Sequence, residues 1–280
     1  MTIALAASEA VARPWGIPAA HFGFEPGGGI ERVGEVRFRR PDTMAAGRLG
    51  LRLVLAGEPV AVEVHPPGRG GEACYVLQAG PEARIGHGLR KEATADAVHA
   101  ALDLQVLPRL LRWIGVKAGD ALPIPAGVLH AIGGGLVLAV VGPEREEALI
   151  LHDYRRGQPL DVEAGIAAAD LGPGPDIPGS VQVDQGRTVL VEGPDLVLER
   201  VVLQPGRPCR LEFAEETWVL VVAGEGRLGG AMPLPSFAAA VADGGAADFE
   251  PGPRGATLLV AYARDRVRPG LVRPGVLSHR

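Results

Sequence analysis

The chain has 280 residues, 47% of them hydrophobic, and a formal net charge of −5. Lysine and arginine form no cluster that would give the basic face needed for nucleic acid, so we expect no nucleic-acid partner. Two cysteines, Cys74 and Cys209, are too few for a disulfide framework or a four-thiolate zinc site. No run of 18 or more apolar residues indicates a membrane-spanning helix, and the first residues do not have the pattern of a secretory signal. We therefore expect a cytoplasmic protein without a membrane partner.

The first half of the chain is predicted to form short strands. The chain has 40 glycines and 25 prolines, which separate Val- and Leu-rich runs of strand length. Residues 48–65 indicate two strands divided by a turn at 56–59. Successive side chains of a strand point to opposite faces, so Glu63 and His65 share one face. A further strand is predicted at 73–78.

A helical insertion is predicted at 92–114. Thr94 is a suitable N-cap, and apolar residues follow at helical spacing: Val98, Leu102, Val106 and Leu110. Pro108 interrupts this pattern, because proline lacks the amide hydrogen that a helix interior needs. We therefore expect two short helices, at 94–104 and 107–113.

The remainder is again predicted to be strand and turn. Strands are expected at 122–124, 128–132, 136–141 and 148–154, and residues 161–170 favour one or two helical turns. Residues 172–179 are rich in glycine and proline, which is typical of a linker. Residues 181–265 show strands and turns throughout. The predicted fold is all-β with a small helical insertion, in two stacked barrels: an N-terminal domain at 1–171, the linker at 172–179 and a C-terminal domain at 180–280.

Four residues have the chemistry of a metal site: Glu63, His65, Glu72 and His130. Glu63 and His65 share a strand face, and the glycine-rich turn at 68–71 can fold the strand of Glu72 back beside them. His130 lies on a distant strand. Two imidazoles with one or two carboxylates suit Zn, Mn, Fe or Ni, and such a set leaves positions open as in catalytic sites. The alternative is that each histidine is an ordinary hydrogen-bonded residue.

The same residues stand in motifs that resemble the type I mannose-6-phosphate isomerases of the cupin superfamily, in their short bacterial form. That family has Gln-Val-His-Pro, then a Glu before Trp-Tyr, then Pro-Ala/Ser-Gly-x-x-His-Ala. This chain has Glu63-Val64-His65-Pro66, Glu72-Ala73-Cys74-Tyr75 and Pro125-Ala126-Gly127-Val128-Leu129-His130-Ala131. The resemblance is good over residues 48–160. Arg13-Pro14-Trp15-Gly16, Gly34-Glu35 and Asp153-Tyr154-Arg155-Arg156 are similar to further family motifs.

The resemblance implies two stacked cupin (jelly-roll) barrels, with one divalent metal, expected to be zinc, in the N-terminal barrel. It implies that Glu63, His65, Glu72 and His130 hold this metal. It further implies the interconversion of an aldose phosphate and a ketose phosphate, mannose 6-phosphate to fructose 6-phosphate, through an enediolate that metal and cations stabilise. The C-terminal half has no comparable set of ligands and is expected to be a metal-free barrel.

Three departures from the family concern charge. Glu63 replaces a glutamine, which adds a negative charge, and Gly70 and Ile150 stand where the family has a lysine and an arginine. Compensating cations are first Arg156 and second Arg155. His152 is a third candidate because it is predicted to share the strand face of Ile150. Further candidates are Arg69 and Arg145; the alternative for all of them is an exposed charge near a turn.

Three functions therefore stay open. The first is a metal-dependent sugar-phosphate isomerase, as a monomer or homodimer. The second is a metal-binding bicupin enzyme that acts on another sugar or small polar substrate, which the lost lysine and arginine favour. The third is a non-catalytic sugar-binding bicupin, which the presence of a full ligand set disfavours.

Overall fold

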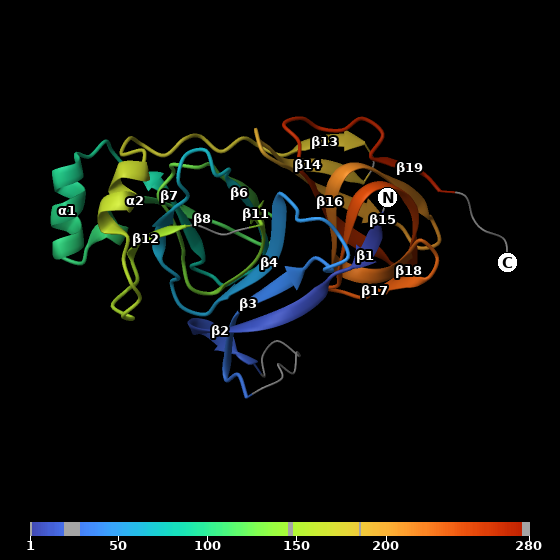
Figure 1. Cartoon of the computed structure of the whole chain (residues 1–280), viewed down its shortest axis with the longest axis horizontal. Coiled ribbons are helices and arrows are strands. Elements are labelled where there is room, and N and C mark those ends of the chain that lie inside the picture. Colours follow the sequence, from blue (N-terminus) through green and yellow to red (C-terminus); the bar gives the residue numbers. More distant parts are fainter. Residues whose placement is uncertain (1, 20–28, 145–147, 185, 276–280) are drawn as a thin grey trace. The chain divides into compact units, whose positions relative to one another are not determined.

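The computed structural model describes residues 2–19, 29–144, 148–184 and 186–275, and strands make up most of it (Figure 1). The chain forms two compact units. The N-terminal unit is Ala10–Arg37 with Arg52–Ile177, and the C-terminal unit is Met1–Glu9, Phe38–Leu51 and Pro178–Arg280. The prediction of a mostly β fold is confirmed. Two stacked barrels and the domain limits at 171 and 180 stay predictions.

Two sheets provide the strands of the N-terminal unit. One has six strands in the order β2-β3-β4-β11-β6-β9, and the other five in the order β12-β5-β10-β7-β8. The bounds of the first are β2 Ala7–Pro18, β3 Arg32–Arg39, β4 Leu49–Ala56, β11 Leu136–Pro143, β6 Glu72–Ala79 and β9 Ala121–Ile124. Those of the second are β12 Leu149–His152, β5 Val62–Val64, β10 His130–Ile132, β7 Arg84–Leu89 and β8 Leu111–Gly115.

Both sheets contribute to one core. Buried side chains from the six-stranded sheet, such as Val54 and Leu138, belong to the same cluster as Ile85 and Ile132 of the five-stranded sheet. The inner face of the five-stranded sheet is thus defined by Ile85 and Ile132. By alternation, Glu63 and His65 share that face, while Val62 and Val64 lie on the outer one.

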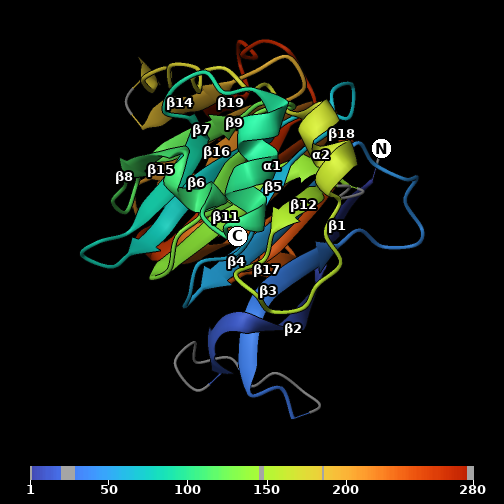
Figure 2. The same cartoon turned by 90° about the vertical axis from the view of Figure 1, so that its left-hand side faces the viewer.

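Two helices, one of them in the predicted insertion at 92–114, cover the outer face of the five-stranded sheet. Helix α1 (Ala95–Asp103) and helix α2 (Val162–Ala168) lie in front of its strands in Figure 2. They pack with Val62, Leu111, Leu129 and Leu151 in a second buried cluster. Among the described residues, no helix is long and apolar enough to cross a membrane.

The first predicted helix of this insertion is confirmed and the second is wrong. The Thr94 hydroxyl accepts a hydrogen bond from the amide of Ala97, so Thr94 is the N-cap of α1. Residues 107–113 do not form a helix. They form one 3-10 turn, Leu107–Arg109, and then enter β8. The reason is twofold: Pro108 allows only the first turn, and Leu111 is buried where β8 pairs with β7.

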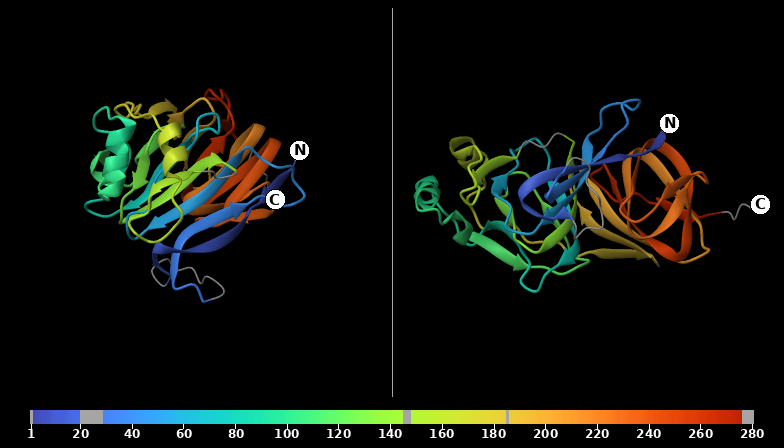
Figure 3. Two further views of the ribbon diagram at one scale, coloured as in Figure 1. Left: turned by 60° about the vertical axis from the view of Figure 1, so that its left-hand side comes forward. Right: turned by 90° about the horizontal axis from the view of Figure 1, so that it is seen from below.

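The C-terminal unit is an eight-stranded sheet. Its order is β13-β14-β15-β18-β16-β17, with β1 on β18 and β19 on β16. The bounds are β13 Val181–Asp184, β14 Arg187–Glu192, β15 Val197–Leu203, β18 Ala239–Tyr262, β16 Cys209–Leu228, β17 Met232–Leu234, β1 Ile3–Leu5 and β19 Val272–Pro274. The long strands β16 and β18, orange to red in Figure 3, curve strongly. Trp218 of β16 pairs with two parts of β18, at Val241 and at Ala261.

A buried ionic network lies in the core of this unit. Arg187 Nε lies 2.5 Å and Nη2 2.8 Å from the two oxygens of Glu199, whose side chain is 0% exposed. The Tyr262 hydroxyl donates to the same carboxylate at 2.5 Å and accepts from the amide of Arg268. The network is satisfied as a whole, so losing one member leaves a buried charge without a partner.

We expect Glu199→Ala to lower the free energy of unfolding by about 3–5 kcal/mol, because it leaves the Arg187 guanidinium buried and unpaired. Tyr262→Phe removes the hydroxyl that donates to Glu199 and accepts from the Arg268 amide, and should cost about 1–3 kcal/mol. Urea denaturation of each variant measures both losses. The control is Arg187→Met with Glu199→Leu, which removes both charges and should cost less than Glu199→Ala alone. A loss below about 1 kcal/mol for Glu199→Ala would contradict this account.

Candidate metal centre

The four predicted ligand residues come together in the interior of the N-terminal unit, between its two sheets. Glu63 of β5 is the register partner of His130 on β10. The Nε2 atom of His130 lies 3.3 Å from Glu63 Oε1, and that of His65 lies 3.3 Å from Glu72 Oε2. The two imidazole rings stack with their centroids 5.0 Å apart. Within the described part of the chain, His65, Glu72 and His130 are the one group of three or more such side chains whose ligand atoms lie within 4.8 Å of one another.

The histidine nitrogens fit a metal ion. His130 Nδ1 lies 3.1 Å from the carbonyl oxygen of Val128, and because a carbonyl only accepts, Nδ1 carries the proton. This leaves the lone pair of Nε2 directed into the cluster. Neither Nε2 has a hydrogen-bond partner among the described residues, although both atoms are buried. A ligating histidine usually donates one ring N–H to a carbonyl or carboxylate, as His130 Nδ1 does here, and keeps the other nitrogen bare for the metal.

The two carboxylates are held ionised in spite of burial. An Arg52 nitrogen lies 2.7 Å from Glu72 Oε1. Burial favours the neutral acid, yet the Arg52 charge lowers the pKa of Glu72 well below its usual range. Burial also opposes ionisation of Glu63, and His130 beside it lowers its pKa overall. Burial lowers the pKa of His65, but the Glu72 carboxylate outweighs it and raises that pKa. The cluster therefore attracts a cation.

Glycines explain how the backbone accommodates the cluster. A Cβ on Gly142 of β11 would lie 2.6 Å from Glu72 Cγ, so this position must stay bare for the carboxylate to fit. Gly127 has a φ of +84° and donates its amide to the carbonyl of His65 at 2.8 Å. The Pro-Ala-Gly turn is thus hydrogen-bonded to the backbone of His65, and the strand that follows it, β10, carries His130.

A polar cavity of about 230 Å³ borders the cluster. Glu63 lines it and is the most exposed ligand candidate, with 15% of its side chain accessible against 2–4% for the other three. Other lining residues come from both sheets: Arg13, Trp15, Glu35, Arg52, Val54, Val60, Ala61, Ile132, Ala148, Ile150 and Gln158. The cluster is thus approached from this cavity past Glu63.

Two cations of this cavity, Arg52 and Arg13, were missed by the sequence analysis. Arg13 Nε lies 2.6 Å from Glu35, which also binds Arg37 at 2.7 Å. A signal for Arg52 was available. It has the same strand parity as Val54, which faces the core, so alternation along β4 turns its side chain inward. An inward arginine in an apolar strand needs an anionic partner.

The three predicted catalytic residues do not line this cavity in the structure as described. Arg156 donates to the carbonyl of Val60 at 2.8 Å and of Asp153 at 3.2 Å, and Arg155 is exposed. A bulge after Ile150 pairs His152 with Val62, on the outer face, so His152 does not share the face of Ile150 as the alternation predicted. A catalytic role for these residues stays a prediction.

The structure also shows where most of the remaining charge-related positions of the sequence analysis lie. Ile150 lines the cavity, so the family's arginine position is apolar here. Gly70 has a φ of +86°, a conformation that strains any other residue, so a lysine there would require a different loop. Arg69 lies in the same loop and is exposed. Arg145 lies outside the described residues.

We expect His130→Ala to lose bound metal while the rest of the fold is retained, because the change removes a ligand, and its partner Glu63 keeps access to the cavity with 15% of its side chain exposed. Metal analysis of protein purified without chelator, together with circular dichroism, measures both. His99→Ala is the matched control, since His99 is a half-exposed histidine on α1 away from the cluster. Full metal content in His130→Ala would contradict the assignment.

Comparisons with known proteins find similarity to mannose-6-phosphate isomerases. No protein-family model matches the sequence. A mannose-6-phosphate isomerase of Streptococcus mutans is 28% identical over 198 residues, which are 63% of this chain and 61% of that protein. The match thus spans less than two thirds of this relative's length.

Solved structures cover more of the chain. The mannose 6-phosphate isomerase of Bacillus subtilis matches with a TM-score of 0.76 at 18% identity, over 94% of this chain and all of that one. A zinc-bound mannose 6-phosphate isomerase structure matches with a TM-score of 0.71 at 12% identity, over 94% of this chain and 100% of the other. The chain therefore has the fold of the mannose-6-phosphate isomerases and resembles them in sequence as a divergent relative.

Proposed function

We propose that the chain is a metal-dependent sugar-phosphate isomerase that converts mannose 6-phosphate to fructose 6-phosphate. The observation that carries this proposal is the buried cluster itself. Two bare imidazole nitrogens and two ionised carboxylates meet beside a cavity whose walls hold Arg13 and Arg52. Similarity to named mannose-6-phosphate isomerases supports the same reaction.

The metal would be held by Glu63, His65, Glu72 and His130. We propose zinc, since the histidine and carboxylate donors suit it and a structural relative is zinc-bound. When bound, the metal would supply Lewis acidity at the sugar oxygens. The carboxylate of Glu63 leaves the site more negative than a glutamine would, which makes it hold a divalent cation tightly but moderates that acidity. A cytoplasmic location and a monomeric or dimeric state remain predictions.

The residues of the chain itself would bind and neutralise the substrate. Isomerisation passes through an enediolate, and the sugar phosphate carries further negative charge. Arg52 lines the cavity beside Glu72, so its guanidinium is near the point where charge would develop. Arg13, fixed by Glu35, lines the same cavity and would hold the anionic substrate. These two cations take the place of the lysine and arginine that the resemblance implied.

One observation favours a second candidate, an enzyme of the same metal type that acts on another sugar or small polar substrate. Ile150 lines the cavity where the resemblance implied an arginine, and it offers no hydrogen bond to a phosphate. A site with fewer phosphate donors suits a less charged substrate.

We expect Arg52→Ala to reduce kcat/KM for mannose 6-phosphate by about 10²–10³, because it removes a preorganised cation from the site. Arg52→Lys keeps a positive charge and should recover part of the loss. A coupled assay on metal-loaded protein gives the rates, and metal analysis separates lost catalysis from lost metal. Arg207→Ala, at an exposed arginine of the C-terminal unit, is the control. Unchanged activity in Arg52→Ala with full metal content would refute the role of Arg52.

The variant Ile150→Arg distinguishes the two candidates. It introduces a guanidinium into the cavity beside Glu63, with which Ile150 is paired in register. If mannose 6-phosphate is the substrate, this variant should lower its KM, whereas Ile150→Leu should leave KM unchanged. If wild-type turnover is negligible, and neither Ile150→Arg nor metal loading raises it, another substrate is favoured instead.

A further inference from the structure

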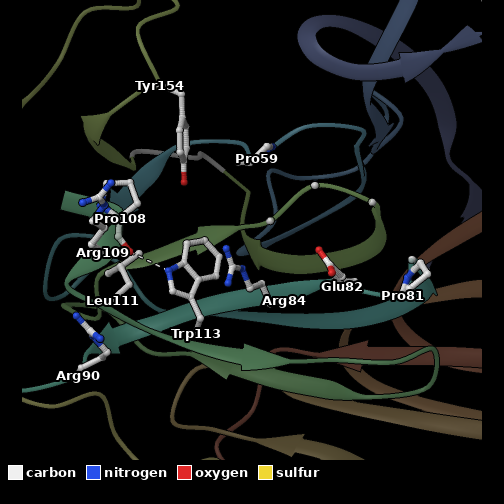
Figure 4. Close-up of a pocket in the computed structure, with 15 residues that line it drawn as sticks. Pro59, Pro81, Glu82, Arg84, Arg90, Pro108, Arg109, Leu111, Trp113 and Tyr154 are labelled. Carbon is white, nitrogen blue, oxygen red and sulfur yellow. Dashed lines mark hydrogen bonds between the residues drawn. The ribbon is translucent and has the colours of Figure 1, made fainter. Parts of the chain in front are cut away.

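A second and larger cavity lies on the other face of the five-stranded sheet. It has a volume of about 1460 Å³ and is lined by residues of β7, β8, the 3-10 turn and the loop at 133–135 (Figure 4). Arg84 and Ile85 are neighbours on β7, and Ile85 is in the inner core, so Arg84 points outward. This outer cavity shares no lining residue with the cavity beside the metal cluster.

The outer cavity is positively charged in a chain of net charge −5. Three arginines, Arg84, Arg90 and Arg109, line it against one carboxylate, Glu82. No salt bridge joins any of these guanidinium groups to a carboxylate in the part of the chain that the structure describes. A concave surface with several unpaired guanidinium groups concentrates anions and favours phosphate, which guanidinium binds in two-point fashion.

Two aromatic rings stand on either side of this charge. The guanidinium carbon of Arg84 lies 4.8 Å from the ring centroid of Trp113, and the indole Nε1 donates to the carbonyl of Pro108 at 2.8 Å. The indole and the guanidinium are thereby fixed. In Figure 4 the ring of Tyr154 stands opposite, with its hydroxyl toward Trp113 and Arg84. Both rings thus offer aromatic surface to a ligand of this cavity.

The segment that carries Tyr154 is preorganised. Tyr154 and Arg155 have φ values of +55° and +64°, which non-glycine residues seldom adopt. The Asp153 carboxylate maintains this turn by accepting the amides of Arg155 at 2.9 Å and Gln158 at 2.7 Å. Strain of this kind persists where the surroundings fix it, and it clusters at ligand sites.

We propose that this outer cavity binds a phosphorylated ligand of the nucleoside diphosphate class, separate from the substrate of the metal centre. The three arginines in its lining suit more than one phosphate group, and the rings of Trp113 and Tyr154 offer aromatic contact to a base. The volume exceeds the roughly 300–1,000 Å³ of a typical small-ligand pocket, so a single hexose phosphate would leave it largely unfilled.

The test titrates ADP into metal-loaded protein without added magnesium, followed by calorimetry and by tryptophan fluorescence. We expect saturable binding with a one-to-one stoichiometry. Arg84→Ala and Arg109→Ala should each weaken it tenfold or more, because each removes a charge-assisted hydrogen bond. Trp113→Phe should abolish the fluorescence change but keep most of the binding, while Arg207→Ala should change nothing.

Competition distinguishes this site from the metal centre. Excess mannose 6-phosphate should not displace ADP, and His130→Ala, which lacks a metal ligand, should bind ADP as wild type does. The proposal is overturned if ADP does not bind at millimolar concentration, or if mannose 6-phosphate displaces it completely. It is also overturned if inorganic diphosphate binds as tightly as ADP, since the rings would then contribute nothing, or if Arg84→Ala and Arg109→Ala, folded by circular dichroism, bind unchanged.

Discussion

The pairing of Glu63 with His130 across β5 and β10 is the constraint on which the metal centre depends. It puts a carboxylate and an imidazole nitrogen 3.3 Å apart in the interior, and the pair formed by His65 and Glu72 repeats that distance beside it. Two ionised carboxylates with two bare nitrogens are costly to bury unless a cation joins them. Arg52 neutralises only one carboxylate, so the cluster retains the charge and the lone pairs that a divalent metal would satisfy.

Much of this centre could be predicted from the sequence because its geometry is local. Glu63 and His65 are two residues apart, so they share one strand face. Gly127 marks a turn whose backbone needs a positive φ, which glycine adopts readily. His152 could not be placed in this way. A single extra residue in β12 moves it to the outer face, and nothing in its neighbours' identities marks that bulge. The helix expected at 107–113 failed for a related reason: pairing with β7 and burial of Leu111 outweighed helical spacing.

The cations show where sequence similarity is least informative. The resemblance directed attention to positions 70, 150 and 155–156. In the structure the charge comes instead from the six-stranded sheet, through Arg13 of β2 and Arg52 of β4. Which sheet supplies a charge depends on contacts between segments far apart in sequence. A divergent relative can therefore lose a cation on one wall of a cavity and retain positive charge from the other.

Because side chains alternate along a strand, the two faces of the five-stranded sheet carry different groups. On β5 and β10 the inward positions hold Glu63 and His130 of the metal cluster, and the outward side of β7 and β8 holds Arg84 and Trp113. The segment after β12 touches both cavities, because Tyr154 lines the outer one and Gln158 the inner one. The Asp153 carboxylate and the bond from Arg156 to Val60 hold this segment as one unit. The same short turn therefore positions one lining residue of each cavity.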